Sequence, residues 1–279
     1  MKKLRNFFRG TYLGLMLIFL YSPILVLMVF SFNGSKSMAR WAGFSFKWYE
    51  ALMHDSTIMN ALMVTLSVAV ISALVATFIG TFAAIGINSM KKRPKSIILN
   101  ISQLPMVNPD LVTGITFMML FAFVNGVLAN MGADRLSDIV KLLIAHISFS
   151  IPYVIFSVMP RLKQSSSMLY EAALDLGCTP MQAMFRVIIP DIMPGITSGF
   201  IMALTMSLDD FVVSYFVSDL RSTLSVYMYS AARGAKGVNP ALATIIFIPL
   251  VTLLLIVNLR RISKEREDEI QNKKVKMKG

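Results

Sequence analysis

The stretch VTLSVAVISALVATFIGTFAAIGI, residues 64–87, contains no Lys, Arg, Asp or Glu. A soluble helix keeps a polar face toward water, so an apolar run of this length predicts a helix that crosses a membrane. The whole chain has the same character, since 56% of its 279 residues are hydrophobic and only 15% are charged. No aqueous core could hold so much apolar surface, and we therefore expect an all-α polytopic membrane protein.

The apolar character recurs in six runs, each long enough to cross about 30 Å of hydrocarbon as a helix. The first run follows several basic residues, as in a signal peptide, but it is too long for one and no small-x-small cleavage site precedes Asn33. We expect it to be retained, giving six crossings in a single transmembrane domain, 1–279. The predicted runs are 12–32, 58–87, 97–125, 139–159, 195–217 and 240–259.

The basic residues behind the net charge of +12 lie in clusters beside these runs. Most of them fall at the N-terminus, in the loops 91–95 and 160–194, and in the charged tail 260–279. The positive-inside rule then predicts that both termini and these two loops are cytoplasmic. Membrane orientation accounts for the basic residues, so no nucleic-acid partner is expected.

The reactive side chains give no indication that this chain catalyses a reaction or binds a metal. Cys178 has no cysteine partner, and His54 and His146 have no metal-ligand spacing, so both histidines are interpreted as structural. The sequence has no phosphate-binding loop of the form G-x-x-x-x-G-K-[ST] and no arrangement of a catalytic triad. We expect no catalytic residue, no metal and no cofactor, and the chain is not predicted to be an enzyme.

The predicted cytoplasmic loop 160–194 is longer than the other connections and has a helical pattern of its own. A first short helix, 168–176, should end at Gly177, and Pro180 can begin a second one. Two prolines are expected to stop that second helix before the next membrane run: Pro190 and Pro194. The loop thus predicts an elbow of two short helices.

Within this loop, EAALDLG at 171–177 is followed by VIIP at 187–190, a pattern that resembles the EAA loop of binding-protein-dependent ABC importer permeases. The resemblance implies the type I ABC importer permease fold, with this loop as the coupling helix that docks in a groove of a separate ATPase. Val187 and Ile189 replace the family's usual Ile and Leu with similar volumes. The other interpretation is an amphipathic helix pair on lipid headgroups. The matching residues are Glu171, Ala172, Ala173, Gly177 and Pro190.

Two acids lie deep in the fifth apolar run, in the segment SLDDFVVS at 207–214. A carboxylate there costs several kcal/mol unless it faces water, a partner or a cation, so Asp210 is the first candidate to line a substrate pathway, with Asp209 beside it. On a continuous helix, one polar stripe would hold Ser207, Asp210, Ser214 and Ser218. Tyr215 and the neighbouring aromatic residues suit an organic ammonium group, although aromatic residues on membrane helices also simply pack.

A third acid, Asp110, follows Pro105 and Pro109, which should break the third run. Broken helices at membrane depth occur where they line a cavity, and the polar Asn108 fits such a lining. Alternatively, all three acids cap interrupted helices or pair with basic groups of a neighbouring subunit.

Aromatic residues are concentrated in the first predicted outer loop. They form either an interfacial belt or a docking surface for an extracellular partner, and the sequence leaves both interpretations open. The residues are Trp41, Phe44, Phe46, Trp48 and Tyr49.

Four further segments resemble the C-type permease of spermidine/putrescine importers: 105–112, 145–154, 207–214 and 229–244. The resemblance implies a bacterial plasma (inner) membrane protein that moves a polyamine by alternating access. It also implies a homologous B-type permease, two ATPase subunits and an extracytoplasmic polyamine-binding protein as partners. The alternatives are a related ABC permease for another small solute and an ATP-independent secondary transporter.

Overall fold

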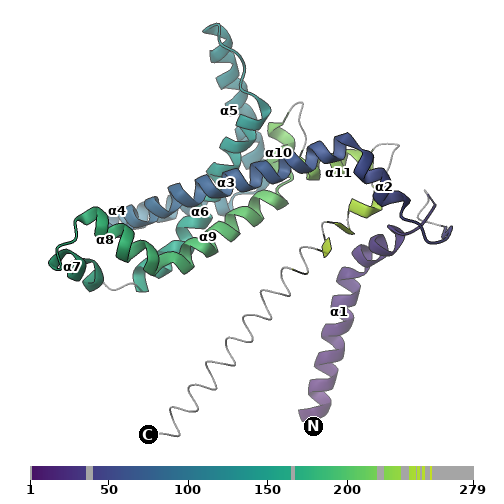
Figure 1. Ribbon diagram of the computed structural model, residues 1–279, viewed down its shortest axis with the longest axis horizontal. Coiled ribbons are helices and arrows are strands. Elements are labelled where there is room, and N and C mark those ends of the chain that lie inside the picture. The colour runs from purple at the N-terminus through teal and green to yellow at the C-terminus, as the bar shows by residue number, and fades with distance from the viewer. Residues whose placement is uncertain are drawn as a thin grey trace. The chain divides into compact units, whose positions relative to one another are not determined.

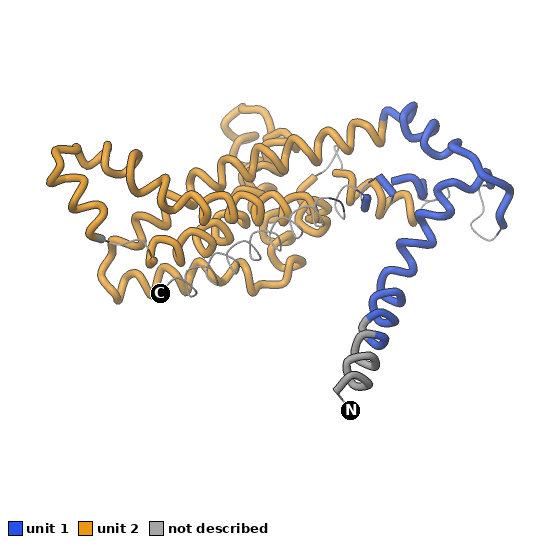
Figure 2. The backbone as a smooth tube through the Cα atoms, turned by 60° about the horizontal axis from the view of Figure 1, so that its bottom comes forward, with its two compact units in different colours: residues 1–56, 234–279 blue, residues 57–233 orange. Residues whose placement is uncertain are grey.

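The computed structural model describes residues 2–35, 40–164, 167–218, 223–233 and 239–242, together with 244, 245, 247, 248 and 252. In these residues the chain is helical, apart from turns, loops and one isolated antiparallel bridge between Asn33 and Phe44. Two compact units are present, the larger comprising residues 57–233 and the smaller 1–56 with 234–279 (Figures 1 and 2). The predicted all-α fold is confirmed.

The larger unit contains the helices that position the candidate sites. They are α3 (Ser56–Ser89), α4 (Lys92–Val107), α5 (Asp110–Asn130), α6 (Asp138–Gln164), α7 (Ser167–Asp175), α8 (Pro180–Ala183), the π-helical turn η1 (Met184–Ile188), α9 (Ile189–Asp209), α10 (Val212–Val217) and α11 (Leu224–Arg233).

Helices α3, α6 and α9 share the first of two cores in this unit. Small residues let the helices approach closely. This is usual in membranes, where the hydrophobic effect does not drive helices together and close packing takes its place. A Cβ atom on Gly80 would lie 2.7 Å from the Val154 Cβ, and one on Gly199 would lie 3.2 Å from the Val154 Cα. Val154 of α6 is therefore held between a glycine of α3 and a glycine of α9.

The second core joins α3, α5, α6 and α10, and here α5 packs against the short helix α10. This core anchors α10, which follows the link from α9, against α5 and α6. Its buried residues are Val68, Phe121, Leu142, Ala145, Val213 and Val217.

Within the described residues, four helical stretches are long and apolar enough to cross a membrane: Ser56–Ser89, Asp110–Asn130, Asp138–Gln164 and Pro180–Asp209. Large apolar side chains remain exposed on them, as a lipid-facing surface requires; Phe78 of α3 is 67% exposed and Phe123 of α5 is 71% exposed. The predicted run 12–32 falls largely within α1 (Lys2–Phe30), whose apolar part is the shorter Gly14–Phe30. The predicted run 240–259 and the tail 260–279 lie mostly or wholly outside the described residues.

The predicted run 97–125 is not one helix, because α4 ends at Val107 and α5 begins at Asp110. Pro109 disfavours a helical conformation at Asn108, which is extended with ψ 135°. Pro105 is accommodated inside α4 and breaks nothing. The predicted break of the third run is therefore confirmed at Pro109 and wrong at Pro105.

The fifth predicted run is also interrupted. Helix α9 ends at Asp209, Asp210 is extended with ψ 124°, and the helix resumes as α10. The expected polar stripe along one continuous helix is therefore wrong. Asp210 lies in the link itself, where its side chain caps the next helix, as described below.

Pro190 and Pro194 do not stop the helix that begins at Pro180, and this expectation was also wrong. The chain continues through η1 into α9 as one helical stretch, Pro180–Asp209. In the wider π turn, the N–H of Ile189 donates to the carbonyl of Met184, five residues back. The π turn places Pro190 in the first turn of α9, where a missing N–H is tolerated.

In the smaller unit, the loop between α1 and α2 (Lys47–His54) is organised around Asn33. Its side-chain amide donates to the Arg40 carbonyl and accepts from the Ala42 N–H, both at 2.8 Å, and its carbonyl accepts from the Trp48 indole at 2.8 Å. An aromatic cluster packs beside it, formed by Phe32, Phe44, Phe46 and Tyr49. The belt and docking interpretations of this loop both stay predictions.

Candidate functional site

The elbow predicted in residues 160–194 is built by a specific helix end. The Gly177 N–H donates to the Leu174 carbonyl at 2.9 Å, and the Cys178 N–H donates to the Ala173 carbonyl at 3.0 Å. This pair of bonds is the Schellman motif, which needs a left-handed residue, and Gly177 has φ +85°. The predicted helix end at Gly177 is confirmed.

The second arm of the elbow begins with a capping box. The Thr179 hydroxyl accepts from the Gln182 N–H at 3.3 Å, and the Gln182 side-chain oxygen accepts from the Thr179 N–H at 3.0 Å. These two bonds satisfy backbone groups that a helix start leaves without partners. The sequence-based prediction did not include this pair, although a Thr followed three residues later by Gln is a recognisable signal.

The elbow buries one of its two EAA-type alanines. Ala173 is 6% exposed, whereas Glu171 and Ala172 lie on the surface. Helix α7 packs against α8 and η1, so a small residue at position 173 serves packing within the elbow. The tip is apolar, and Leu176 there is 86% exposed.

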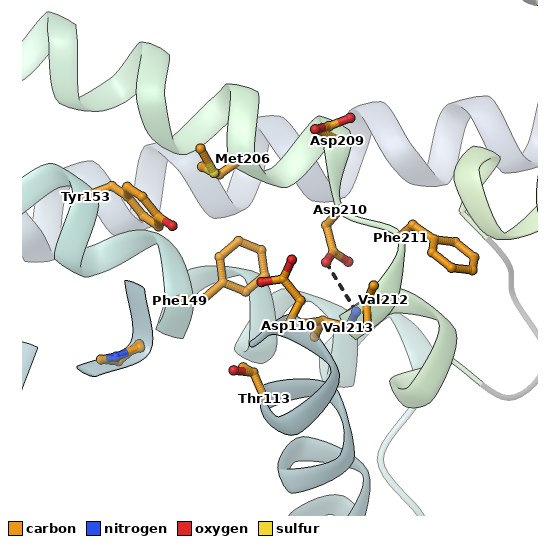
Figure 3. Close-up of a pocket in the computed structure, with 11 residues that line it drawn as sticks. Asp110, Thr113, Phe149, Tyr153, Met206, Asp209, Asp210, Phe211, Val212 and Val213 are labelled. Atoms are coloured by element: carbon orange, nitrogen blue, oxygen red, sulfur yellow. Dashed lines mark hydrogen bonds between the residues drawn. The ribbon is translucent and has the colours of Figure 1, made fainter. Parts of the chain in front are cut away.

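The three acids predicted from sequence line one pocket of about 180 Å³ (Figure 3). Asp110 comes from the first turn of α5, and Asp209 and Asp210 come from the end of α9 and the link to α10. The two helix breaks at Pro109 and Asp210 thus bring acids from distant parts of the chain together. Among the described residues, no Lys or Arg lines the pocket, so its carboxylates favour a cation.

Asp210 is the most enclosed of these acids, with a side chain only 9% exposed. Its carboxylate accepts from the N–H groups of Val213 at 3.2 Å and Ser214 at 2.8 Å and so caps α10 (Figure 3). The capping alternative therefore holds for Asp210. Capping and lining are compatible, because a carboxylate has about four acceptor positions.

Phe149 and Tyr153 of α6 are part of the pocket wall, and Phe211 of the link also lines the pocket, although its ring is directed away from the acids (Figure 3). Phe149 and Tyr153 were not predicted from sequence, because the sequence of α6 alone does not indicate that these residues face the helix breaks at Pro109 and Asp210. Ser214 and Tyr215, selected from sequence, do not line the pocket. Ser214 is buried, and Tyr215 packs with Phe211, Phe216 and Tyr229.

A buried imidazole lies behind Asp210. His146 Nδ1 is 2.6 Å from the Ser207 hydroxyl, and Nε2 is 3.2 Å from the Ser214 hydroxyl and 3.5 Å from the Asp210 carboxylate. The Ser207 hydroxyl is in turn 3.1 Å from that of Ser72 in α3. The histidine interpreted as structural thus lies in a polar network that contacts a pocket acid.

Comparison with known proteins links this architecture to a family. Residues 76–266 match the family of the binding-protein-dependent transport system inner membrane component. The putrescine transport system permease protein PotI of Escherichia coli K12 is 36% identical over 260 residues, covering 91% of each chain. The spermidine/putrescine transport system permease protein PotC of the same strain is 32% identical over 262 residues, covering 92% of this chain and 94% of that protein.

Solved structures agree on the fold. A bacterial ABC transporter involved in the import of the acidic polysaccharide alginate has a chain that aligns with a TM-score of 0.69 at 20% identity, covering 95% of this chain and 99% of that one. The alginate transporter in complex with its alginate-bound periplasmic protein aligns with a TM-score of 0.70 over 91% of both chains. The expected importer-permease fold is confirmed, and the chain belongs to the family of binding-protein-dependent transport system inner membrane components, the multi-pass permeases of ABC importers.

Proposed function

We propose that this permease moves a polyamine, such as putrescine or spermidine, into the bacterial cytoplasm. The observation that carries the proposal is the pocket in which Asp110, Asp209 and Asp210 meet without a lining Lys or Arg among the described residues. A polyamine carries several ammonium groups, and carboxylates offset the cost of removing water from them. Phe149 and Tyr153 add aromatic surfaces that attract alkylammonium groups.

The names of the relatives support the same substrate class, because PotI and PotC are permeases for putrescine and for spermidine/putrescine. The alternative is a related importer for another small solute. A pocket with three acids disfavours an anion such as the alginate carried by the structural neighbours. A secondary transporter is disfavoured because an ion-driven carrier has no ATPase to hold at the elbow.

The elbow is proposed to be the contact with the ATPase, through the exposed Glu171, Ala172, Gly177 and Pro190, while Ala173 packs inside it. One helical stretch, Pro180–Asp209, begins at this elbow and ends at the pocket acid Asp209, a length of about 45 Å at 1.5 Å per residue. A displacement of the elbow is therefore transmitted directly to the pocket. ATP-driven closure of two ATPase subunits would in this way switch the pocket between outward and inward access.

The remaining partners in the proposal are a homologous B-type permease, which completes the pathway, and an extracytoplasmic polyamine-binding protein, which delivers the substrate. The binding protein makes the first selection among solutes. The acid pocket then accepts the released cation. Both termini of the permease are proposed to lie in the cytoplasm, on the same side as the elbow.

The proposal is tested with the complete transporter in proteoliposomes, by measuring uptake of labelled putrescine and spermidine. Asp210→Asn removes the charge but keeps an oxygen that can cap α10, and Asp110→Asn removes the charge in the first turn of α5 with little change in size. Each is expected to lower uptake about tenfold, the effect of losing one charge-assisted contact to the cation.

Asp134→Asn is the matched control, because Asp134 is an exposed acid outside the pocket. It should transport at the unmodified rate. If Asp110→Asn and Asp210→Asn also transport normally, the acids do not line the pathway. If both lower uptake of polyamine and of an uncharged solute alike, the pathway is shared but the substrate class is wrong.

A further inference from the structure

We propose that His146 is a positioning residue that fixes the carboxylate of Asp210 at the pocket, acting through its Nε2 atom. This inference rests on the proposed function, since it assigns a role to His146 through a pocket acid. His146 itself does not line the pocket and is 1% exposed.

The need for such a residue follows from the break between α9 and α10. Asp210 directly follows the last residue of α9 and is extended, with ψ 124°, so its side chain is not held on the surface of that helix. Its two bonds to the N–H groups of Val213 and Ser214 attach it only to α10. A contact from α6 would also fix the acid relative to Phe149 and Tyr153, which α6 contributes to the pocket wall.

His146 supplies contacts to both sides of this break from α6. Its Nδ1 atom meets Ser207 in the last turn of α9 at 2.6 Å, and Nε2 meets Ser214 in the first turn of α10 at 3.2 Å. The ring also packs against Phe149 of the pocket wall, with centroids 5.0 Å apart. One imidazole therefore connects the end of α9, the start of α10 and α6.

The two ring nitrogens have different tasks. The carboxylate of Asp210 can only accept and lies 3.5 Å from Nε2, so the proposal assigns the ring hydrogen to Nε2. In the neutral ring, Nδ1 then accepts from the Ser207 hydroxyl, which lies 3.1 Å from the Ser72 hydroxyl. Ser207 and Ser72 orient the ring, and Nε2 orients the acid.

This division of tasks allows a test with two isosteres. The amide of Asn occupies roughly the position of Nδ1, and the amide of Gln occupies roughly that of Nε2. In the complete transporter, His146→Gln should retain most of the polyamine uptake, while His146→Asn should lose about tenfold, as expected for losing a hydrogen bond to a charged group. The thermal unfolding midpoints of the two variants in detergent are measured in parallel, so that any loss of stability in the smaller Asn variant is separated from a loss of uptake.

The same two substitutions are then made together with Asp210→Asn. If His146 acts through Asp210, the difference in uptake between the Asn and Gln variants should disappear in this background. Should His146→Asn fail to assemble, Ser207→Ala removes only the group that orients the ring, and it should lower uptake with Asp210 present but not with Asp210→Asn.

Equal uptake by the two isosteres, or a difference that persists without the Asp210 charge, would overturn the positioning role. A loss of uptake that parallels a fall in the thermal unfolding midpoint would also overturn the positioning role and make His146 purely structural. These results are distinct from failure of the proposed function, which is seen when Asp210→Asn alone transports polyamine normally.

Discussion

Single residues determine how the elbow bends, and Gly177 is the clearest case. Its φ of +85° costs an L-residue roughly 1–2 kcal/mol, whereas glycine adopts it freely and asparagine tolerates it better than most residues. The Schellman bonds from Gly177 and Cys178 are formed only with this backbone geometry. The backbone of the elbow therefore requires a glycine at position 177, whether or not a partner binds there.

We predict that Gly177→Ala weakens the coupling of substrate to ATP hydrolysis in the complete transporter, because the altered helix end reorients α7. Gly177→Asn should retain more of the coupling. The measurement is ATP hydrolysis with and without the substrate-loaded binding protein. Equal behaviour of the two variants would mean that the left-handed conformation is not what the elbow requires.

Helices are positioned by close approach at glycines rather than by large side chains. The contact of Gly80 and Gly199 with Val154 sets how near α3 and α9 come to α6, and this determines where α9 ends relative to the α6 side chains Phe149 and Tyr153. A Cβ atom added to Gly86, in the same helix α3, would meet no neighbouring group within 4 Å. The chain therefore offers two glycines in one helix with opposite surroundings.

We predict that Gly80→Ala lowers the stability of the protein in detergent by roughly 1–3 kcal/mol, since an added methyl group would overlap Val154. Gly86→Ala should be neutral or slightly stabilising, because alanine favours helix. The stability of both variants is measured by heating the protein in detergent and following the loss of the folded protein by gel filtration. A Gly80→Ala protein as stable as the Gly86→Ala protein would contradict this packing.

At the scale of the whole molecule, the proposed orientation places the elbow in the cytoplasm and the loop between α5 and α6 outside. Cys178 is the single cysteine of the chain and lies in the elbow, partly exposed. It is a natural probe of sidedness that requires no other cysteine to be removed.

We predict that a membrane-impermeant maleimide labels Cys178 in inverted membrane vesicles and not in right-side-out vesicles. With Cys178→Ser and Asp134→Cys combined, the labelling should be reversed, because residue 134 lies in the proposed outer loop. Labelling of Cys178 from the outside would require the orientation, and with it the proposed ATPase contact, to be discarded.

Several of these features could be read from the sequence alone. Composition and uninterrupted apolar runs predict membrane helices, because a single segment in lipid can pair all its backbone N–H and C=O groups only as a helix. The glycine at 177 and the proline at 180 predict the elbow because both act on local backbone geometry. The acids at 110, 209 and 210 stand out because burying a carboxylate within an apolar membrane segment has a large free-energy cost, whatever the neighbouring helices are.

Other features depended on tertiary structure. A proline can break a helix, as at Pro109, or be accommodated by a π turn, as at Pro190, and the neighbouring packing decides between these outcomes. That Asp110 meets Asp209 and Asp210, that Phe149 and Tyr153 face them, and that His146 lies behind Asp210 are contacts between residues far apart in the chain. Sequence spacing describes one element at a time, whereas a pocket is formed by the positions of several elements, which only their packing determines.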